Sequence, residues 1–278
     1  MPALFWNAYD SSKLAVGKGE AIMKALLRAA LVAVLVLGAS FGAHAQTETT
    51  LIAPGGIRAP LDELVPRYEK KTGQKVKATY GSGGGTRKQV VSGEAFDVPV
   101  IQLPDSDVLA SGQVIAGSAR PLASVAVGVA VAHGAPKPDI STPEAVKRML
   151  LSAKSISYPD PSGGAAAGVS FLATLKQLGI AEQVQPKIKL GSGGADAMVK
   201  VAKGEVEIGL TYVSEMDVPG IDIVGPLPQQ ISPPTRLEGF ISAHAKDPAA
   251  AKALLDFLSS PEAAAVYRAH KMEPGRSE

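Results

Sequence analysis

Glycine-rich loops are the residues of this chain whose types and spacing could do chemistry. Four of them each follow a segment that reads as a strand and lead into one that reads as a helix: residues 53–56, 81–86, 162–164 and 191–194. Such a loop turns unpaired backbone N–H groups and the positive end of the helix dipole toward whatever lies in front of it. Taken singly, each loop could be an ordinary turn, because Gly and Ser are common turn residues. Their recurrence in the same setting favours a site that binds an anion through backbone amides.

Three basic residues closely follow the first two loops. Arg58 lies two residues beyond the first loop, and Arg87 and Lys88 come directly after the second. An arginine binds a planar carboxylate through two parallel hydrogen bonds, so these side chains added to backbone amides would suit a carboxylate as well as a tetrahedral oxyanion. The alternative is that all three are solvated charges on the first turns of surface helices.

Metal binding and nucleophilic catalysis have no signature in the sequence. The chain has no cysteine, and His133, His244 and His270 lack the spacing of a metal site. Ser82 is not the centre of a Gly-x-Ser-x-Gly nucleophile elbow, and its loop does not end in the Gly-Lys-Ser/Thr of a phosphate-binding P-loop. We therefore expect no metal and no cofactor.

Segments that read as strands and helices alternate after the first loop. Apolar residues recur at helical spacing over residues 61–68, and Thr72-Gly73 ends that helix. The remaining strands are predicted at residues 76–80, 125–132, 156–158, 188–190 and 208–212, and further helices at 165–178 and 196–203. This alternation is typical of an α/β protein with largely parallel sheets, whose ligands bind at the carboxyl ends of the strands. The glycine loops fall at those ends.

The N-terminal region reads as a secretory leader rather than as part of the fold. Met23-Lys24 and Arg28 form a basic start, residues 29–37 form a short apolar run, and Ala43-His44-Ala45 has the small residues of a cleavage site. We expect Met23 to be the true initiator and cleavage to follow Ala45, so that residues 1–45 combine an upstream extension with the signal. These features predict a periplasmic protein.

The charge of the mature chain argues against a nucleic-acid partner. The whole sequence has 28 Lys+Arg and 26 Asp+Glu, of which residues 1–45 hold 4 and 2, so 24 of each remain. A nucleic-acid binder usually carries a basic excess or a basic stripe. Local geometry must therefore supply any selectivity for an anion.

Several motifs occur together in a characteristic order. They are Pro54-Gly55-Gly56, Gly81-Ser82-Gly83-Gly84, Phe96-Asp97-Val98, Tyr158-Pro159-Asp160-Pro161-Ser162-Gly163-Gly164, residues 203–212 with Tyr212 at their end, and Phe257-Leu258-Ser259-Ser260-Pro261-Glu262-Ala263. In this order the chain resembles the periplasmic solute-binding proteins of the molybdate-binding type. The resemblance spans nearly all of the mature chain.

The resemblance implies a fold and a mode of action. The fold would be the type 2 periplasmic-binding-protein fold, in which two α/β lobes, each a mostly parallel sheet flanked by helices, are joined by two crossovers. Lobe 1 would comprise residues 46–124 and 224–278, and lobe 2 residues 125–223. A monomer of this kind would close on a small anionic ligand and deliver it to an ABC permease in the inner membrane, without a cofactor.

The resemblance also implies which residues bind the ligand. In molybdate binders, serine hydroxyls of the first two loops, backbone N–H groups of the second lobe and a tyrosine hydroxyl surround the anion. Ser82 and Tyr212 match this pattern, whereas Gly55 and Gly56 stand where the first hydroxyl is expected. Two ligand classes therefore stay open, a molybdate-like oxyanion and a carboxylate. The residues predicted to bind the ligand are Gly55, Gly56, Arg58, Ser82, Gly83, Arg87, Ser162, Gly163, Gly164 and Tyr212.

An enzyme is the alternative to a receptor. A few proteins that resemble the molybdate-binding receptors are aconitate isomerases, which move an allylic proton of a tricarboxylate without a cofactor. In that alternative Tyr212, Tyr158 or Glu215 would carry the proton. None of these residues stands in a sequence pattern of catalysis, so the receptor is the preferred interpretation.

Overall fold

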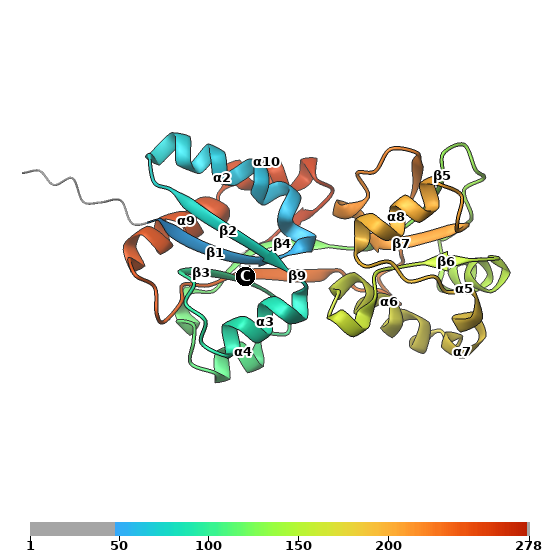
Figure 1. Cartoon of the computed structure of the whole chain (residues 1–278), viewed down its shortest axis with the longest axis horizontal. Coiled ribbons are helices and arrows are strands. Elements are labelled where there is room, and N and C mark those ends of the chain that lie inside the picture. Colours follow the sequence, from blue (N-terminus) through green and yellow to red (C-terminus); the bar gives the residue numbers. More distant parts are fainter. Residues whose placement is uncertain (1–47, 277–278) are drawn as a thin grey trace, which may run out of the picture. The chain divides into compact units, whose positions relative to one another are not determined.

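Helices and strands alternate along the part of the chain that the computed structural model describes, residues 48–276 (Figure 1). The predicted leader, with Met23 and the cleavage after Ala45, lies outside these residues. The strands are β1 (Thr49–Pro54), β2 (Val76–Gly81), β3 (Val98–Gln102), β4 (Arg120–Val125), β5 (Val127–Ala132), β6 (Ile156–Ser157), β7 (Ile208–Tyr212), β8 (Ile221–Pro226), β9 (Thr235–Gly239) and β10 (Glu273–Pro274). The α-helices are α2 (Arg58–Thr72), α3 (Gly83–Val91), α4 (Ser106–Ala110), α5 (Pro143–Ser152), α6 (Ala166–Gln177), α7 (Ala181–Val184), α8 (Gly194–Ala202), α9 (Pro248–Leu258) and α10 (Pro261–Ala269). Short 3-10 turns are η1 (Gly55–Ile57), η2 (Ala116–Ser118), η3 (Pro161–Gly163), η4 (Gln185–Lys187) and η5 (Val213–Glu215).

The strands form two sheets. The large sheet has the order β10-β4-β9-β3-β1-β2, and the small sheet has the order β6-β7-β5-β8. This confirms the predicted α/β class with two sheets. The prediction that the sheets are mostly parallel is wrong, because three strand pairings of the described residues are parallel and five are antiparallel. Each antiparallel pairing involves β4, β5 or β9, which are strands next to the connections between the sheets.

Two connections join the sheets. Ala126 alone separates β4 of the large sheet from β5 of the small sheet, and residues 227–234 lead from β8 back to β9. The single strand predicted over residues 125–132 is therefore two strands, which belong to different sheets. The strand predicted at residues 188–190 is reduced to a bridge between Ile188 and Ile156. The lobe boundaries remain predictions.

The core of the large sheet follows the alternation of side chains along its strands. In β1, Leu51 and Ala53 belong to the same buried cluster as Leu61 of α2, whereas Ile52 belongs to another cluster with Val90 of α3. Successive side chains of a strand point to opposite faces, so one strand supplies both clusters. Figure 1 accordingly shows α2, α9 and α10 on one side of this sheet, and α3 and α4 on the other.

The small sheet is covered in the same way. Val129 of β5 is buried in one cluster with Phe171 of α6, and its neighbour Ala130 is buried in another cluster with Met198 of α8. Helix α8 therefore covers one face and α6 the other. The helices hold the strand ends, and with them the glycine loops, in fixed positions.

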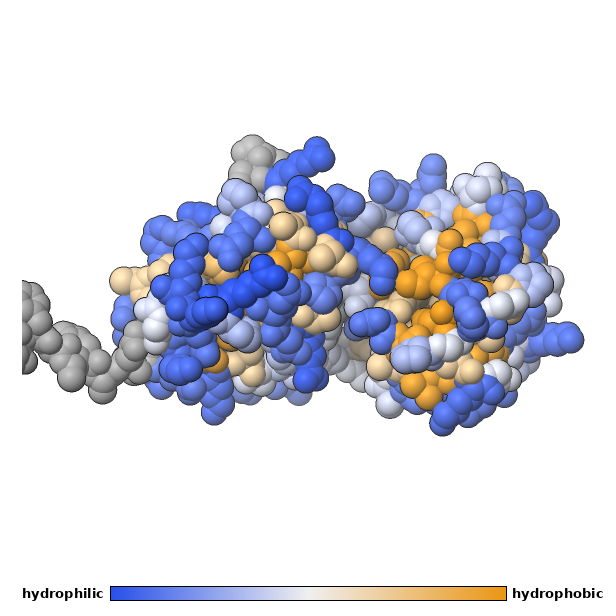
Figure 2. Space-filling view, turned by 90° about the horizontal axis from the view of Figure 1, so that it is seen from above, coloured by the Kyte–Doolittle hydropathy of each residue, from blue (hydrophilic) through white to orange (hydrophobic). Residues whose placement is uncertain are grey.

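The surface is uneven in hydropathy. In Figure 2, hydrophilic residues cover most of the part of the molecule that holds the large sheet, whereas apolar residues come to the surface over the part that holds the small sheet. No helix in residues 48–276 combines the length and the apolar character that crossing a membrane requires.

Candidate functional site

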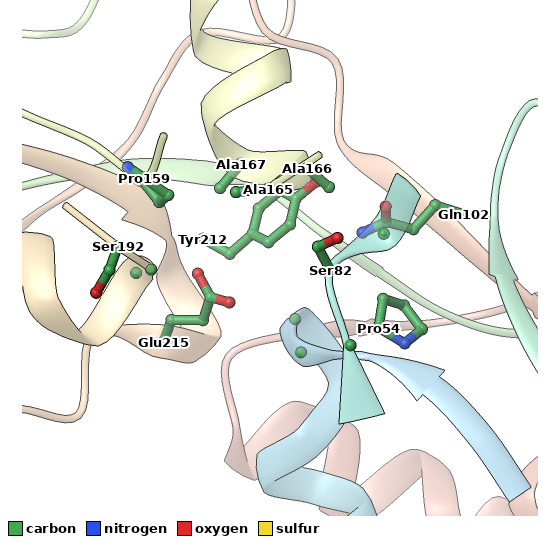
Figure 3. A pocket seen from close by; sticks show the side chains of 16 residues that line it. Pro54, Ser82, Gln102, Pro159, Ala165, Ala166, Ala167, Ser192, Tyr212 and Glu215 are labelled. Atoms are coloured by element: carbon green, nitrogen blue, oxygen red, sulfur yellow. The ribbon is translucent and has the colours of Figure 1, made fainter. Parts of the chain in front are cut away.

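Glycine loops from both sheets line one cavity of about 210 Å³ (Figure 3). The loop after β1, the loop after β2 and the loop before α8 all reach it. The third glycine loop does not, but Pro159 and residues 165–167, which flank that loop, complete the wall. The cavity therefore lies between segments of the large sheet and segments of the small sheet.

The pairing of β1 with β2 brings the first two loops together. These strands are parallel, and their last residues, Pro54 and Gly81, are partners in the register. The carboxyl ends of parallel neighbours meet at one edge of a sheet, so Gly55 and Ser82 leave the sheet side by side. Both residues line the cavity.

The amino end of α3 supplies polar groups from the second loop. The Ser82 hydroxyl caps the helix, since its Oγ accepts a hydrogen bond of 3.0 Å from the N–H of Gly85. As the oxygen is the acceptor in this bond, the hydroxyl hydrogen remains available as a donor. Gly83 is the first residue of the helix and also lines the cavity, where the helix dipole favours negative charge.

The amino end of α8 contributes from the opposite wall. Ser192, Gly193 and Gly194 line the cavity, and Gly194 is the first residue of α8. The Asp196 carboxylate accepts a hydrogen bond of 2.9 Å from the N–H of Ser192, and this bond shapes the turn into the helix. Two helix amino ends are thus directed at the same cavity from different sheets.

Gln102 adds a side-chain amide at the end of β3. Its side chain is 9% exposed, and its Nε2 is buried with no hydrogen-bond partner among residues 48–276. In Figure 3 the amide points toward Ser82. A buried donor without a partner costs about 1–3 kcal/mol, so this amide is a group that a ligand would satisfy.

Close packing against Gln102 explains why Gly83 has no side chain. A Cβ at Gly83 would lie 1.9 Å from Oε1 of Gln102. Any larger residue at position 83 would push the amide out of the cavity wall.

Tyr212 forms a wall of the cavity rather than a donor. Its side chain is 2% exposed, and its hydroxyl donates a hydrogen bond of 2.9 Å to Oγ1 of Thr235. Burial raises the pKa of this phenol above its ordinary value. The ring lies against Gly56, where a Cβ would be 2.9 Å from Cδ2 of Tyr212. The ring therefore leaves no room for a side chain, and so for a hydroxyl, at position 56.

Glu215 places a carboxyl group against the cavity. The hydroxyl of Thr211 donates a hydrogen bond to its Oε2, and a Cβ at Gly194 would lie 2.2 Å from the same oxygen. Oε1 lies 3.9 Å from the position that a Cβ of Gly55 would take. The carboxyl thus reaches from the start of α8 toward the first glycine loop. Burial raises the pKa of Glu215.

Two contacts join segments of the two sheets next to the cavity. The N–H of Gly84 donates a hydrogen bond of 3.2 Å to the carbonyl of Gly164. The hydroxyl of Ser214 donates a buried bond of 2.8 Å to the carbonyl of Gly56. Both contacts use a backbone carbonyl of a glycine loop, so glycine loops also hold the two walls together.

Arg58 lies away from the cavity. Its side chain is exposed, lies 3.2 Å from a carboxylate oxygen of Asp62 and stacks over the ring of Tyr80 at 5.1 Å. Arg87 is bonded to Asp107 and to the carbonyl of Gln102.

The cavity that Arg87 does line is a neighbouring one of about 300 Å³, which shares Gly83, Gln102, Ala166 and Tyr212 with the first and also includes Gly164. Arg87 and Gly164 are therefore close to the site without lining the first cavity.

The other predicted residues lie outside the first cavity as well. Ser162 and Gly163 are exposed in η3, where the N–H of Ser162 bonds the side chain of Asp160 at 2.9 Å. Tyr158 is buried with its ring 5.0 Å from that of Phe171, and burial raises its pKa. Of the predicted binding residues, the structure brings together Gly55, Gly56, Ser82, Gly83 and Tyr212.

The arrangement can bind a small anion without a basic side chain. The described lining of the first cavity includes no Lys, Arg or His. Its donors are backbone N–H groups at two helix starts, the Ser82 hydroxyl and the Gln102 amide, while Glu215 supplies an ionisable acid. A volume of about 210 Å³ equals the share of about seven waters in the liquid at roughly 30 Å³ each, which is room for a ligand of several heavy atoms.

A family model and two curated relatives each match most of this chain. The model of a family described as bacterial extracellular solute-binding protein matches residues 49–273. An aconitate isomerase of Pseudomonas sp is 34% identical over 82% of this chain and 88% of its own length. The molybdate-binding protein ModA of Azotobacter vinelandii is 30% identical over 85% of this chain and 95% of its own length.

Solved structures give the same fold. A periplasmic molybdate-binding protein of Azotobacter vinelandii superposes with a TM-score of 0.66 at 20% identity, and the match covers 81% of this chain and 98% of that one. At this identity the likeness concerns the fold alone.

Proposed function

We propose that this chain, which belongs to the family of bacterial extracellular solute-binding proteins, captures a small organic carboxylate in the cavity between its two sheets. The observation that carries the proposal is the convergence of two helix amino ends, the Ser82 hydroxyl and the unpartnered Gln102 amide on one cavity. Such groups stabilise an anion through short, directed hydrogen bonds. Like the receptor that the sequence predicts, it would be a periplasmic monomer that hands its ligand to an ABC permease.

The side chains favour a carboxylate over a tetrahedral oxyanion such as molybdate. The resemblance to molybdate receptors implies hydroxyl donors from both first loops and from a tyrosine. Here the first loop has no hydroxyl, and the hydroxyl of Tyr212 is bonded to Thr235. Ser82 is the one side-chain hydroxyl of that pattern left at the cavity within residues 48–276. In place of the hydroxyls of the molybdate pattern, the cavity has the planar amide of Gln102 and the planar carboxyl group of Glu215.

Lobe closure would provide capture and release. The Gly84–Gly164 and Ser214–Gly56 hydrogen bonds join segments of the two sheets beside the cavity. A ligand that contacts both walls favours the state in which these bonds form, which is a population shift of the hinge type. A permease that recognises only this state would then receive loaded protein.

A thermal-shift panel tests the proposal. The panel contains citrate, trans-aconitate, propane-1,2,3-tricarboxylate and succinate beside molybdate, tungstate, sulfate and phosphate. A ligand at 100 times its Kd stabilises the folded state by about 2.7 kcal/mol. For a chain of this size that corresponds to a rise in Tm of roughly 5–10 °C. A rise with the carboxylates alone is expected, whereas a rise with molybdate alone, or with none of the eight, would refute the proposed ligand class.

Isomerisation of a tricarboxylate is the second candidate function. It is favoured by the Glu215 carboxyl, which faces the cavity and whose pKa burial raises toward the range that suits proton transfer. The 34% identity to an aconitate isomerase supports it as well. In this reaction a base removes a proton from the CH₂ group of trans-aconitate, the double bond shifts, and the proton returns at the former vinyl carbon. Tyr212 and Tyr158 are less suited to this role, because burial raises the pKa of both phenols.

Incubation with trans-aconitate separates the two functions. The formation of cis-aconitate is followed by chromatography for the wild type and for Glu215→Gln, with the exposed carboxyl variant Glu205→Gln as the control. Turnover that Glu215→Gln abolishes and Glu205→Gln preserves would establish the isomerase. Binding of trans-aconitate without any turnover would leave the receptor.

A further inference from the structure

We propose that Glu215 carries a proton whenever an anion occupies the cavity, and that this proton forms a hydrogen bond to the anion, so that capture of the anion takes up one proton from solution. The inference rests on the proposed capture of an anion, because it concerns the same cavity and an anionic ligand. It does not extend to the second candidate function, in which Glu215 would have to be ionised to act as the base. It assigns Glu215 as the residue that makes binding selective for ligands with a hydrogen-bond acceptor at this position.

The first step is the distribution of charge around the cavity. A bound carboxylate and an ionised Glu215 would be two negative charges in one confined space, and the described cavity lining holds no Lys, Arg or His to offset them. Like charges that share a site raise the pKa of one of them. Hydrogen-bond donors on both walls stabilise the charge of the anion, so Glu215 is the group that becomes protonated.

The second step is the position of the proton. Oε2 accepts the hydrogen bond from Thr211 and lies against Gly194 at the start of α8. Oε1 is on the side of Gly55 and the first glycine loop. A proton on Oε1 therefore has the cavity in front of it, and Figure 3 shows the Glu215 carboxyl directed into the open space opposite Ser82.

The third step concerns the other ionisable groups around Glu215. From β7, Tyr212 is the other ionisable side chain of the described cavity lining, and its hydroxyl is bonded to Thr235. From α8, Asp196 is bonded to Ser192 and paired with Lys200 at 2.8 Å. These groups are engaged elsewhere, so Glu215 is the acid that responds to the ligand.

On the side of the second loop, Arg87 of α3 is bonded to Asp107 and to the carbonyl of Gln102. On the side of the first loop, the charged residue that begins α2 is Arg58. It is turned to Asp62 and the ring of Tyr80. Burial already raises the pKa of Glu215 without a ligand. An anion raises the pKa further, because it adds a like charge.

The linkage has a definite sign. At a pH between the pKa of Glu215 in the free protein and its pKa in the complex, binding is accompanied by proton uptake. In that range the Kd increases about tenfold for each unit of rising pH, since one proton accompanies each bound anion. Below the pKa of the free protein, Glu215 is already protonated and the Kd no longer changes with pH.

Isothermal titration calorimetry measures the proton directly. The probe is propane-1,2,3-tricarboxylate, which has the carboxylates of trans-aconitate but no allylic system to isomerise. Its first two carboxyl groups ionise with pKa values near those of Asp and Glu, about 4 to 5. The third lies beside two like charges and ionises roughly one to two units higher, so all three are ionised between about pH 7.5 and 9. Titrations in Tris and in HEPES at equal pH and ionic strength differ in heat by the number of protons exchanged. We expect a maximum of about one proton for the wild type within that pH range.

The variants identify the group that takes up the proton. Glu215→Gln should lower the proton count to near zero and flatten the dependence of Kd on pH, and Glu205→Gln, which changes an exposed carboxyl, should leave the count near one. Infrared difference spectra of the wild type provide a measurement that needs no variant: the carbonyl band of a protonated carboxyl should grow when the tricarboxylate is added.

The outcomes separate the two proposals. Binding without proton uptake at every pH from about 7.5 to 9, or uptake that survives Glu215→Gln, would overturn the role of Glu215 while leaving capture of the anion intact. No binding of the tricarboxylate to the wild type at any of these pH values would instead count against carboxylate capture itself, and the inference would fall with it.

Discussion

Replacing Gly56 by alanine tests the packing that gives the cavity its wall. The new Cβ would lie 2.9 Å from Cδ2 and 3.1 Å from Cε2 of Tyr212. Real Cβ atoms do not approach ring carbons so closely, and the ring is 2% exposed and tied through its hydroxyl to Thr235. Forcing an extra carbon into a packed interior costs about 1–3 kcal/mol. For a domain of this size, that corresponds to a fall in Tm of roughly 2–12 °C.

Gly55→Ala is the matched control for this experiment. Its Cβ would have its nearest neighbour, the carbonyl oxygen of Gly81, at 3.8 Å, which is ordinary contact. Neither Gly55 nor Gly56 has a positive φ, so alanine fits the backbone at both positions. We therefore expect Gly55→Ala to change the free energy of unfolding by less than about 1 kcal/mol.

Urea unfolding followed by circular dichroism compares the two variants. The reasoning predicts a clear loss of stability for Gly56→Ala and almost none for Gly55→Ala, with unchanged m-values. Equal losses for both variants would show that the first loop, and not the contact with Tyr212, sets the cost. A harmless Gly56→Ala would show that the ring of Tyr212 can move, and the explanation for the missing hydroxyl would then be refuted.

Three further predictions concern the groups at the cavity. Gln102→Leu removes a buried donor that lacks a partner within residues 48–276, so the free energy of unfolding in urea should stay the same or increase. The Kd for citrate should rise by roughly 10- to 150-fold, equivalent to about 1.5–3 kcal/mol for a hydrogen bond to a charged group. An unchanged Kd would exclude Gln102 from the site. The pKa of Glu215 is raised in the folded state. The contribution of Glu215 to stability is therefore complete below the ordinary Glu pKa of about 4.3 and is lost as the pH rises through the folded-state pKa. Glu215→Gln should gain stability relative to the wild type between pH 5 and pH 8, and the opposite trend would contradict the effect of burial. Ser82→Ala and Ser260→Ala each remove a helix N-cap and should each cost about 0.5–2 kcal/mol in urea unfolding, but only Ser82→Ala should also weaken the binding of citrate; equal affinities would show that Ser82 acts as a cap alone.

The family and the glycine loops could be predicted from the sequence, because both depend on local order. Pro54-Gly55-Gly56 and Gly81-Ser82-Gly83 stand directly after apolar strands, and a strand that ends in glycine before a helix start has few other structures to adopt. The strand pairing in the register Pro54–Gly81 then brings these loops together. The position of each of these two loops therefore follows from residues that are close to it in the sequence.

Side-chain partners and sheet membership could not be predicted, because they depend on residues far apart in the chain. The apolar run over residues 125–132 gives no sign that Ala126 is the point where the chain changes sheets. The hydroxyl of Tyr212 is bonded to Thr235, which is 23 residues away. Gln102 is a polar residue at the end of a buried strand, and that is the signal that could have directed attention to it. The Ser192-Gly193-Gly194 segment is recognisable in the sequence as a glycine loop at the end of a strand, but its residues are not among those predicted to bind the ligand, although all three line the cavity.

The place of β9 in the large sheet has a consequence for how the chain folds. This strand lies between β3 and β4, yet it follows the whole small sheet in the sequence. Before β9 is present, β3 has only β1 as a neighbour, and β4 has no partner in the large sheet except β10, which comes later still. A chain that emerges amino end first, from a ribosome or from a membrane channel, therefore cannot complete its first sheet until residues 235–239 have followed. Contacts between residues so distant in sequence form slowly. The large sheet therefore stays incomplete, with one edge of β3 unpaired, until most of the chain has been delivered.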